Sequence, residues 1–455
     1  MPSFSLQEIQ AATGASPVTG ASLPDVFTGV STDTRNLLPG QLFVPLVGER
    51  FDGHDYLDQA LAAGATGVLW SRPERPASAP LLAVEDTLEA YQWLGSAYLK
   101  RLGVPVVAIT GSTGKTTTKD LVAAMLSSRY RVHKTEANYN NDIGVPLTLL
   151  TMPEDTEVAV LELAMRGAGQ IRRLARLLDA RVGLITNIGE SHIELLGSLE
   201  AIADAKGELL ECLSSEAVAV LPACSPFFAR LAGKTKATIR SFSAHPGARA
   251  TLSPLALENL GIDGWRITLE GGRPFVFSLP GTHHLEDLMA ALLAVAELGV
   301  KVEDCSGVLR SFRPTGLRME VLNLSGGVKV INDSYNAAPA SVEGALEVLC
   351  GTTNRRVAVL GDMLELGEHA AEGHQRVGRA CARLGVDFLL AVGSQSRALA
   401  EAAREGGVDN VVWVASREEA AGVLKTSLQP NDWVLFKASR GMGLDQLVAG
   451  LGASS

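Results

Sequence analysis

The stretch VVAITGSTGKTTTKD, residues 106–120, decides the fold and sets the functional question. An apolar strand is followed by a glycine-rich turn, and an amphipathic helix is predicted from Lys115. Glycines let the backbone approach phosphate oxygens, and the N–H groups at a helix start point towards a bound anion. Lys115 would reach the β- and γ-phosphates, and the Thr116 hydroxyl would bind Mg²⁺. The sequence therefore predicts a nucleotide loop, although only two residues separate Gly111 from Gly114 where the common P-loop has four.

Length and composition indicate a globular protein of several domains. At 455 residues, 46% of them hydrophobic and 20% charged, the chain has apolar material for about three domains and no sign of disorder. The formal charge of −10 argues against a nucleic-acid partner. No apolar run approaches the ~20 residues of a membrane span, and the N-terminus lacks the pattern of a signal peptide. We expect a cytoplasmic monomer with buried free thiols at its five widely spaced cysteines, Cys212, Cys224, Cys305, Cys350 and Cys381.

Alternating strands and helices predict an α/β fold in three domains. Residues 1–103 contain short strands and turns with one helix, which fits a small α/β N-terminal domain. Residues 104–313 alternate continuous apolar strands with helices, which predicts a central P-loop-type ATPase domain with a mainly parallel sheet. Within it, the pattern turns to antiparallel-like pieces around residues 235–280, such as WRITLEGGRPFVFSLPG. After the linker FRPTG, residues 312–316, a second strand–helix series predicts a C-terminal Rossmann-like domain over residues 314–455.

Two polar residues follow apolar strands of the predicted central sheet. Glu162 lies in TEVAVLELA, and His192 comes shortly after RVGLITNIG. Ligands of open α/β sheets bind at the carboxyl ends of the strands, so both residues are candidates for a nucleotide site. From the residues alone, a turn histidine and a solvated helical lysine remain the simpler interpretations of His192 and of Lys206 in LEAIADAKGELL.

The short loop, preceded by AIT, resembles the nucleotide loop of the Mur ligases and folylpolyglutamate synthetases, and the resemblance extends over essentially the whole chain. It implies that Glu162 and His192 bind Mg²⁺ together with Thr116. It further implies that Lys206, in AKGE, helps to position a second Mg²⁺ if the lysine is carbamylated, because a carbamate supplies oxygen donors. The loop residues implied to bind ATP are Gly111, Ser112, Thr113, Gly114, Lys115, Thr116 and Thr117.

Other motifs resemble the branch of the Mur ligases that adds D-alanyl-D-alanine. TEANYNNDIGVPLTLL, residues 135–150, is similar to GNxNNxIGVP, with Ala137 in place of the first glycine, and GDMLELG, residues 361–367, is a second mark of this branch. Residues 30–57 resemble the domain that binds the UDP-sugar. Turn formation stays open as the interpretation of each polar residue in these loops. The implied substrate contacts are Ser31, Asp33, Arg35, Asn138, Asn140, Asn141, Tyr335 and Asn336.

One motif of the ATP site departs from the family pattern. LPGTHHLEDLMAALLA keeps His283 of GxHNxxNxLAA, but His284 and Asp287 replace the two asparagines. An ionised Asp287 accepts hydrogen bonds and cannot donate one, so the contact that the resemblance implies with adenine can differ from the usual amide contact.

Three further motifs follow the linker. Arg318 in GLRME matches an arginine that reaches the γ-phosphate, and its planar fork suits that charge, although an interdomain salt bridge is an alternative. Asp333 in INDSYNAAPAS would face the nucleotide. FKASRGMGLDQL resembles KGSRxxxME and retains Lys437, Ser439 and Arg440.

The resemblance implies a reaction. ATP phosphorylates the terminal carboxylate of UDP-N-acetylmuramoyl-tripeptide, and the amino group of D-alanyl-D-alanine attacks the acyl phosphate, while Lys115, Arg318 and Mg²⁺ neutralise developing charge. No motif identifies the third residue of the peptide as diaminopimelate, lysine or ornithine.

Two alternatives to this reaction differ from it in the substrates or in the use of ATP. A related ligase would use another acid and amine, such as folate and glutamate or another muramyl step, which GDMLELG and NNDIGVP argue against. A nucleotide-gated binding module would hydrolyse ATP only to switch partners. The combination of Glu162, His192 and Lys206 with a first domain resembling a UDP-sugar binder argues against that module.

Overall fold

The computed structural model describes residues 2–18, 22–74, 76 and 79–452, and the chain divides into two compact units. The first unit comprises residues 1–108, 129–165 and 169–181, and the second comprises residues 109–128, 166–168 and 182–455. Strand β8 (Val106–Thr110) begins in the first unit and ends in the second. Each unit has a hydrophobic core of its own.

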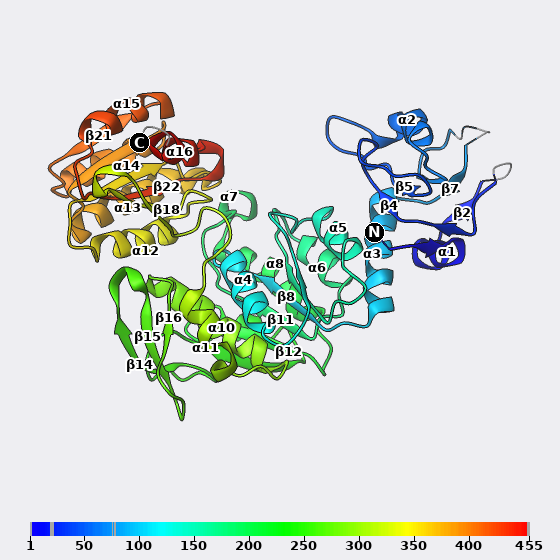
Figure 1. Cartoon of the computed structure of the whole chain (residues 1–455), viewed down its shortest axis with the longest axis horizontal. Coiled ribbons are helices and arrows are strands. Elements are labelled where there is room, and N and C mark those ends of the chain that lie inside the picture. The colour runs from blue at the N-terminus through cyan, green and yellow to red at the C-terminus, as the bar shows by residue number, and fades with distance from the viewer. Residues whose placement is uncertain (1, 19–21, 75, 77–78, 453–455) are drawn as a thin grey trace. The chain divides into compact units, whose positions relative to one another are not determined.

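The N-terminal part of the first unit is built on a five-stranded sheet (Figure 1). The strand order is β2 (Ser16–Pro17), β7 (Leu81–Ala83), β6 (Gly67–Trp70), β5 (Leu42–Phe43) and β4 (Val30–Ser31), parallel except for the antiparallel edge strand β2. Separately, β1 (Phe4–Ser5) pairs with β3 (Val26–Phe27). Phe43, Val68 and Leu81 lie in the core of this part. Its helices are α1 (Leu6–Thr13), η1 (Gly53–Tyr56), α2 (Leu57–Ala62) and α3 (Thr87–Leu102).

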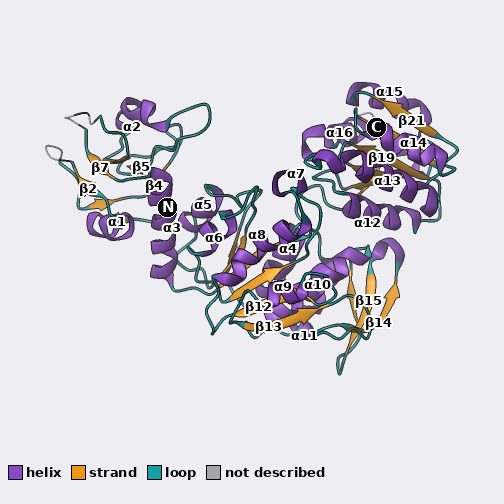
Figure 2. Ribbon diagram, turned by 180° about the vertical axis from the view of Figure 1, so that it is seen from behind, coloured by secondary structure: helices purple, strands orange, loops and turns teal. Residues whose placement is uncertain are grey.

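The middle of the sequence forms a six-stranded sheet. Its four inner strands are fully buried, as continuous apolar runs predict. Its order is β13 (Thr238–Phe242), β12 (Val218–Pro222), β11 (Val182–Ile185), β8, β10 (Val158–Glu162) and β9 (Val132–Lys134). In the second unit, β11, β12 and β13 are parallel, and α9 (Phe228–Ala232) and α10 (Thr282–Ala296) pack against β12 (Figure 2). The other helices of this region are α4 (Lys115–Leu126), α5 (Gly144–Leu150), α6 (Gln170–Ala175), α7 (Ile193–Leu196) and α8 (Leu199–Glu211).

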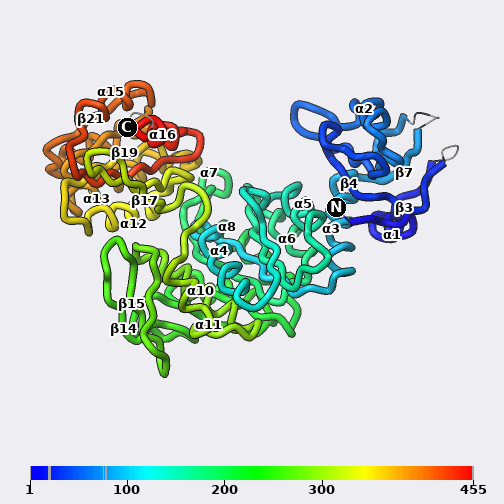
Figure 3. The backbone as a smooth tube through the Cα atoms, viewed as in Figure 1, coloured from blue at the N-terminus to red at the C-terminus, as the bar shows by residue number. Residues whose placement is uncertain are grey.

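An antiparallel sheet follows in the second unit, as the sequence predicts, but the prediction was wrong for the start of the range, because β13 pairs with β12 in parallel. It contains β14 (Pro254–Asn259), β15 (Trp265–Leu269) and β16 (Phe275–Phe277), with the short helix η2 (Gly261–Asp263) between the first two strands. Helix α11 (Val302–Ser311) packs on β16. The chain then runs without helix or strand from α11 to β17 (Glu320–Asn323), across the predicted linker (Figure 3).

The C-terminal part of the second unit is a second α/β layer structure. Its sheet has the order β17, β18 (Lys329–Asn332), β22 (Trp433–Lys437), β19 (Arg356–Gly361), β20 (Phe388–Val392) and β21 (Val411–Val414), parallel except for β17. Helix α12 (Pro339–Cys350) lies on one side of this sheet and α15 (Arg417–Ser427) on the other (Figure 1). Ala420 and Leu424 of α15 belong to the buried cluster of the sheet, and α15 packs on β20 and β21. The helices are η3 (Ser325–Gly327), α12 (Pro339–Cys350), η4 (Gly367–His369), α13 (Ala370–Leu384), α14 (Ser396–Glu405), α15 (Arg417–Ser427), η5 (Arg440–Met442) and α16 (Asp445–Gly452).

The predicted fold class is confirmed, with a mainly parallel central sheet and a Rossmann-like C-terminal part. The domain boundaries at 103/104 and 313/314 stay a prediction. No helix of the described residues is long and apolar enough to cross a membrane. All five cysteines are free, but the expectation that they are buried was wrong for three of them, because Cys224 is exposed in the turn after β12 and Cys212 and Cys350 are half-buried at helix ends.

Candidate active site

The loop between β8 and α4 is held in shape by the segment that follows β11. Ser112 N–H donates to Asn187 O at 3.0 Å, and Thr113 N–H donates to Asn187 Oδ1 at 3.0 Å. Thr186 Oγ1 donates to Thr113 O at 2.6 Å. A Cβ on Gly111 would lie 1.8 Å from Thr186 Oγ1, so a side chain there would displace this contact. The loop is therefore a preformed structure, which is what an anion site at a helix start requires.

The side chain of the loop lysine, Lys115, folds back onto the backbone of the loop. Lys115 Nζ donates to Gly111 O at 2.8 Å and to Ser112 O at 3.3 Å. Thr116 is buried, and its Oγ1 accepts a hydrogen bond from Arg318 Nη2 at 3.1 Å. The second unit thus brings together the predicted loop lysine, the predicted Mg²⁺-binding hydroxyl and the predicted γ-phosphate arginine.

Arg318 is fixed by contacts on several sides. Its guanidinium lies 3.8 Å from the centre of the Tyr335 ring, and its Nη1 donates to Thr315 O at 3.2 Å. The flanking residues Leu317 and Met319 have φ values of 53° and 47°, which cost non-glycine residues of the order of 1 kcal/mol each. The backbone is therefore held in an unfavourable conformation at the residue predicted to meet the γ-phosphate.

Two buried carboxylates hold the linker segment on either side of Arg318. Asp120 of α4 accepts hydrogen bonds from the Thr315 N–H at 3.1 Å and from the Thr315 hydroxyl. Asp333 Oδ1 accepts from Met319 N–H at 3.3 Å, and Asp333 Oδ2 lies 2.6 Å from Lys437 Nζ. Asp120 had not been predicted. A polar residue in the first turns of the loop helix is its only signal in the sequence.

His192 and Lys206 lie in the same electrostatic neighbourhood as Lys115. Burial lowers the pKa of His192, and the charges of Lys115 and Lys206 lower it further, against an opposing effect of Glu365. His192 Nδ1 is 2.7 Å from Glu365 Oε2, although the angles are not those of a hydrogen bond. Lys206 is 2% exposed, and burial together with the Lys115 charge lowers its pKa well below the ordinary range. The interpretation of Lys206 as a solvated helical lysine is therefore wrong, because this face of α8 is turned into the protein.

Glu162 belongs to the first unit, where it is buried at the end of β10. Asn140 Nδ2 donates to Glu162 Oε1 at 2.8 Å, and Glu162 N–H donates to Thr135 Oγ1 at 3.0 Å. Asn141 Oδ1 instead accepts from Gly144 N–H at 2.8 Å, as an ordinary turn former does. Ala137, at the position where the family has glycine, has a φ of 46°, so this departure carries backbone strain.

Helix α10 carries two adjacent histidines and a carboxyl group that reaches the loop helix. The rings of His283 and His284 are 3.9 Å apart between centroids. Asp287 Oδ1 accepts from Thr118 Oγ1 at 3.2 Å, and a Cβ on Gly114 would lie 2.1 Å from this oxygen. The carboxyl group therefore packs directly against the last glycine of the loop.

The predicted UDP-sugar residues form a local cluster in the first unit. Ser31 Oγ donates to Asp33 O at 3.0 Å, and Arg35 forms a fork with Asp33, with Nη2 2.7 Å from Oδ2. The hydrogen bonds from the Arg35 side chain and backbone N–H lower the pKa of Asp33. The side chain of Arg35 is 86% exposed, which leaves its outer face open to a ligand.

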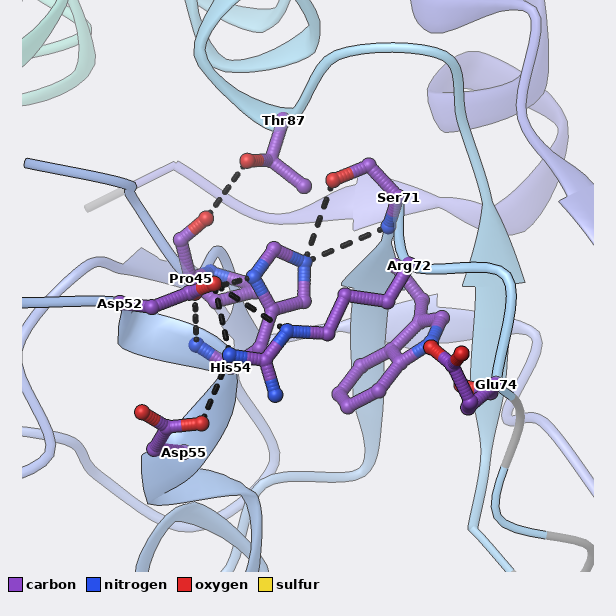
Figure 4. A network of polar contacts seen from close by, with 9 residues as sticks. Pro45, Asp52, His54, Asp55, Ser71, Arg72, Glu74 and Thr87 are labelled. Atoms are coloured by element: carbon purple, nitrogen blue, oxygen red, sulfur yellow. Dashed lines mark hydrogen bonds and ion pairs between the residues drawn. The ribbon is translucent and has the colours of Figure 1, made fainter.

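A buried histidine holds the second half of the same predicted segment (Figure 4). His54 Nε2 accepts from Ser71 N–H at 3.3 Å, so Nδ1 carries the proton and donates to Asp52 Oδ1 at 2.6 Å. Arg72 donates to Asp52 and to Asp55. Burial alone would raise the pKa of Asp52, but the hydrogen bonds from His54 and Arg72 lower it to about 2. The network joins the loop after β5 to the end of β6, and no pattern in the sequence had indicated it.

Sequence comparison matches the chain to three known domains. Residues 26–111 match the catalytic domain of the Mur ligase family, residues 109–295 the Mur ligase middle domain, and residues 317–440 the Mur ligase glutamate ligase domain.

Relatives along the whole chain carry similar names. The UDP-N-acetylmuramoyl-tripeptide–D-alanyl-D-alanine ligase of Bacillus subtilis (strain 168) is 39% identical over 432 residues, covering 94% of this chain and 93% of that protein. The enzyme of that name from Escherichia coli (strain K12) is 33% identical, covering 95% and 98%. A crystal structure of MurF from Acinetobacter baumannii has a TM-score of 0.91 at 30% identity, covering 100% of this chain and 99% of that one. MurF from Thermotoga maritima in complex with ADP has a TM-score of 0.83 at 26% identity, covering 93% and 97%. This chain belongs to the Mur ligase family.

Proposed function

We propose that this chain joins D-alanyl-D-alanine to UDP-N-acetylmuramoyl-tripeptide through an acyl phosphate, releasing ADP and phosphate and making a UDP-muramoyl-pentapeptide precursor of peptidoglycan. The observation that carries the proposal is 39% identity to a ligase of that name over 94% of the chain. The preformed loop, with Lys115 over its backbone and Arg318 at Thr116, supports the ATP-dependent step. The five free cysteines fit a cytoplasmic location.

The predicted Mg²⁺ ligands have suitable chemistry. Thr116 and Glu162 are buried oxygen donors, which Mg²⁺ prefers, and His192 is half-buried. Among the described residues no three His, Cys, Asp or Glu side chains form a metal cluster, so the proposed set depends on the threonine hydroxyl and on a carbamate at Lys206. When bound there, Mg²⁺ would supply positive charge to the phosphate oxygens.

The proposed catalytic work of the side chains is electrostatic. A carboxylate is a poor electrophile until one of its oxygens becomes a phosphate leaving group. Lys115 and Arg318 would oppose the negative charge that develops on the transferred phosphoryl group, and the Arg318 fork is already oriented by Tyr335. Asp333, held by Lys437, would face the nucleotide, and Asn336 would border the substrate.

The substrate contacts are proposals of two kinds. Ser31, Asp33 and Arg35 would contact the UDP-sugar, with Arg35 pre-oriented by its fork on Asp33. Asn138 and Asn141 would line the same substrate from the central part of the first unit. Asn140, because it donates to Glu162, would act by orienting that carboxylate.

The test is phosphate release from Mg²⁺–ATP by the purified full chain, with each substrate omitted in turn. Release that needs both UDP-muramoyl-tripeptide and D-alanyl-D-alanine, with a pentapeptide product by mass spectrometry, is the expected result. Tripeptides ending in diaminopimelate, lysine and ornithine, used in parallel, identify the third residue. Release that is indifferent to the dipeptide would overturn the proposal and favour a nucleotide-gated module.

Lys206 is expected to carry a carbamate when the protein is supplied with CO₂. Burial and the Lys115 charge lower the pKa of the amine, which favours the neutral form that attacks CO₂ and releases a proton to give N–COO⁻. With ¹³C-bicarbonate and Mg²⁺ present, a carbamate ¹³C resonance is expected in the natural chain and should disappear in Lys206→Met. Lys234→Met is the matched control, because Lys234 is paired with Asp204 and Glu211 and its pKa is raised. A resonance that persists in Lys206→Met would contradict the assignment.

A further inference from the structure

Asp287 is a buried carboxyl group at the foot of the phosphate loop. It is 4% exposed, on α10, and its Oδ1 accepts from Thr118 Oγ1 at 3.2 Å. The same oxygen lies so close to Gly114 that a Cβ there would be 2.1 Å away. Its Oδ2 is 3.4 Å from His284 Nδ1. The group therefore touches the loop helix, the last loop glycine and one imidazole.

The charged groups around Asp287 have other partners. Lys115 Nζ is bound to loop carbonyls, Lys119 is 3.3 Å from Asp120, and Lys437 is 2.6 Å from Asp333. Arg318 acts on Asp287 only through space, while its fork contacts Thr116. The remaining titratable groups on the elements packed with α10 are His283 and Glu286 on α10 itself, Glu297 with Arg240 of β13 at its far end, and Glu343 and Glu347 on α12.

Burial without a matched cation favours neutral forms in both members of the His284–Asp287 pair. Burial raises the pKa of Asp287 to about 8, against lowering effects of Thr118 and Arg318, and burial lowers the pKa of His284 to about 4. At pH 7 the carboxyl is then protonated. It can donate from Oδ2 to the unprotonated His284 Nδ1, while Oδ1 accepts from Thr118. In this neutral form both oxygens of the carboxyl group have a partner, and the buried pair carries no charge.

We propose that Asp287 is a positioning residue that supports the phosphate loop as a neutral carboxylic acid, and that its ionisation weakens nucleotide binding. The proposal rests on the proposed ATP site. A carboxylate against Gly114 would lie close to the phosphates that the loop receives, and the two negative charges would repel each other in a buried place. A protonated Asp287 supplies one donor and one acceptor, as the asparagine amide of the family pattern does. Aspartate in place of asparagine therefore preserves hydrogen bonding only while its carboxyl group is protonated.

Bound nucleotide favours the protonated acid, so affinity is full below the folded pKa of Asp287 and falls as the pH rises through it. For one proton, the dissociation constant rises by up to about tenfold for each pH unit above that pKa. Between pH 7 and pH 9 the natural chain should therefore lose about tenfold in affinity for ADP.

The experiment is calorimetric titration of the full chain with ADP and Mg²⁺ at pH 7, 8 and 9, beside Asp287→Asn. The variant cannot ionise, so its dissociation constant should change less than about twofold beyond the change intrinsic to ADP, which both proteins share. Glu286→Gln, a carboxyl of the same helix that accepts from Ala244 N–H, should keep the behaviour of the natural chain. Equal pH dependence in the natural chain and Asp287→Asn, or loss of the dependence in Glu286→Gln, would overturn the proposal but leave the ATP site standing. Absence of ADP binding at every pH would overturn both.

A second measurement needs no variant. Infrared spectra of the chain labelled with ¹³C at aspartate side chains should show a carboxylic-acid C=O band at pH 7 that shifts with the label. The band should disappear between pH 7 and pH 9. An ionised spectrum at pH 7, with no such band, would overturn the proposal even if Asp287→Asn does not fold.

Discussion

Lys115→Met is expected to lower kcat/KM for ATP on the order of 10²–10³-fold while leaving the fold intact. The substitution keeps the length of the side chain and removes its charge and its donors. Removing one preorganised donor from a site of developing negative charge costs about 3–4 kcal/mol, which is a loss of this size. In the structure the lysine's Nζ is bound by the Gly111 and Ser112 carbonyls, so it lies at the loop before any nucleotide arrives.

The measurement is the rate of phosphate release over a range of ATP concentrations, with both co-substrates saturating. Lys236→Met is the control, because Lys236 is exposed between α9 and β13 and its loss should change the rate less than about twofold. If Lys115→Met kept more than a tenth of the natural activity, the loop would hold phosphate by its backbone alone. Circular dichroism of both variants separates a catalytic loss from an unfolded protein.

Secondary structure was predictable wherever the pattern is local. β8, β10 and the parallel strands of the C-terminal sheet are mainly apolar runs, and the sequence predicts each of them. Helix α3 was not predicted, although Asp86 caps its start and Gly103 ends it, because its apolar residues are spread among polar ones. β17 was also not predicted, since this antiparallel edge strand, EVLN, is half polar and mostly exposed.

The sequence predicts which residues form the candidate site, but it does not predict which of them contact one another. The loop motif itself contains the lysine and the threonine of the site. Residues that contact the loop from distant parts of the chain have no recognisable pattern in the local sequence. Thr118 and Asp287 are 169 positions apart, and only the packing of α10 on α4 joins them. In the same way, the burial of Lys206 depends on tertiary packing around α8, and the donation of Asn140 to Glu162 depends on a turn closing onto β10.

Arg318→Ala is expected to lower kcat on the order of 10³-fold, and Arg318→Lys on the order of 10²-fold. Lysine keeps the charge but loses the planar fork, which here stacks on Tyr335 and donates to Thr116. Because the lysine variant separates charge from geometry, its residual activity measures how much of the effect is the positive charge alone. Steady-state phosphate release with all substrates saturating reports kcat, and KM for ATP should change much less, since the arginine acts mainly on developing charge.

The strained backbone on both sides of Arg318 supports the expectation that the orientation of its guanidinium matters. Leu317 and Met319 have positive φ angles in a segment that Asp120 and Asp333 bind on both sides. Energy stored in that way is retained where an orientation matters, and the orientation here is that of the guanidinium. Arg310→Lys, an exposed position on α11, is the matched control and should retain natural kcat. Equal activity of the Arg318→Lys variant and the natural chain would mean that the charge alone suffices, and the strained segment would then have no role in orienting the guanidinium for phosphoryl transfer.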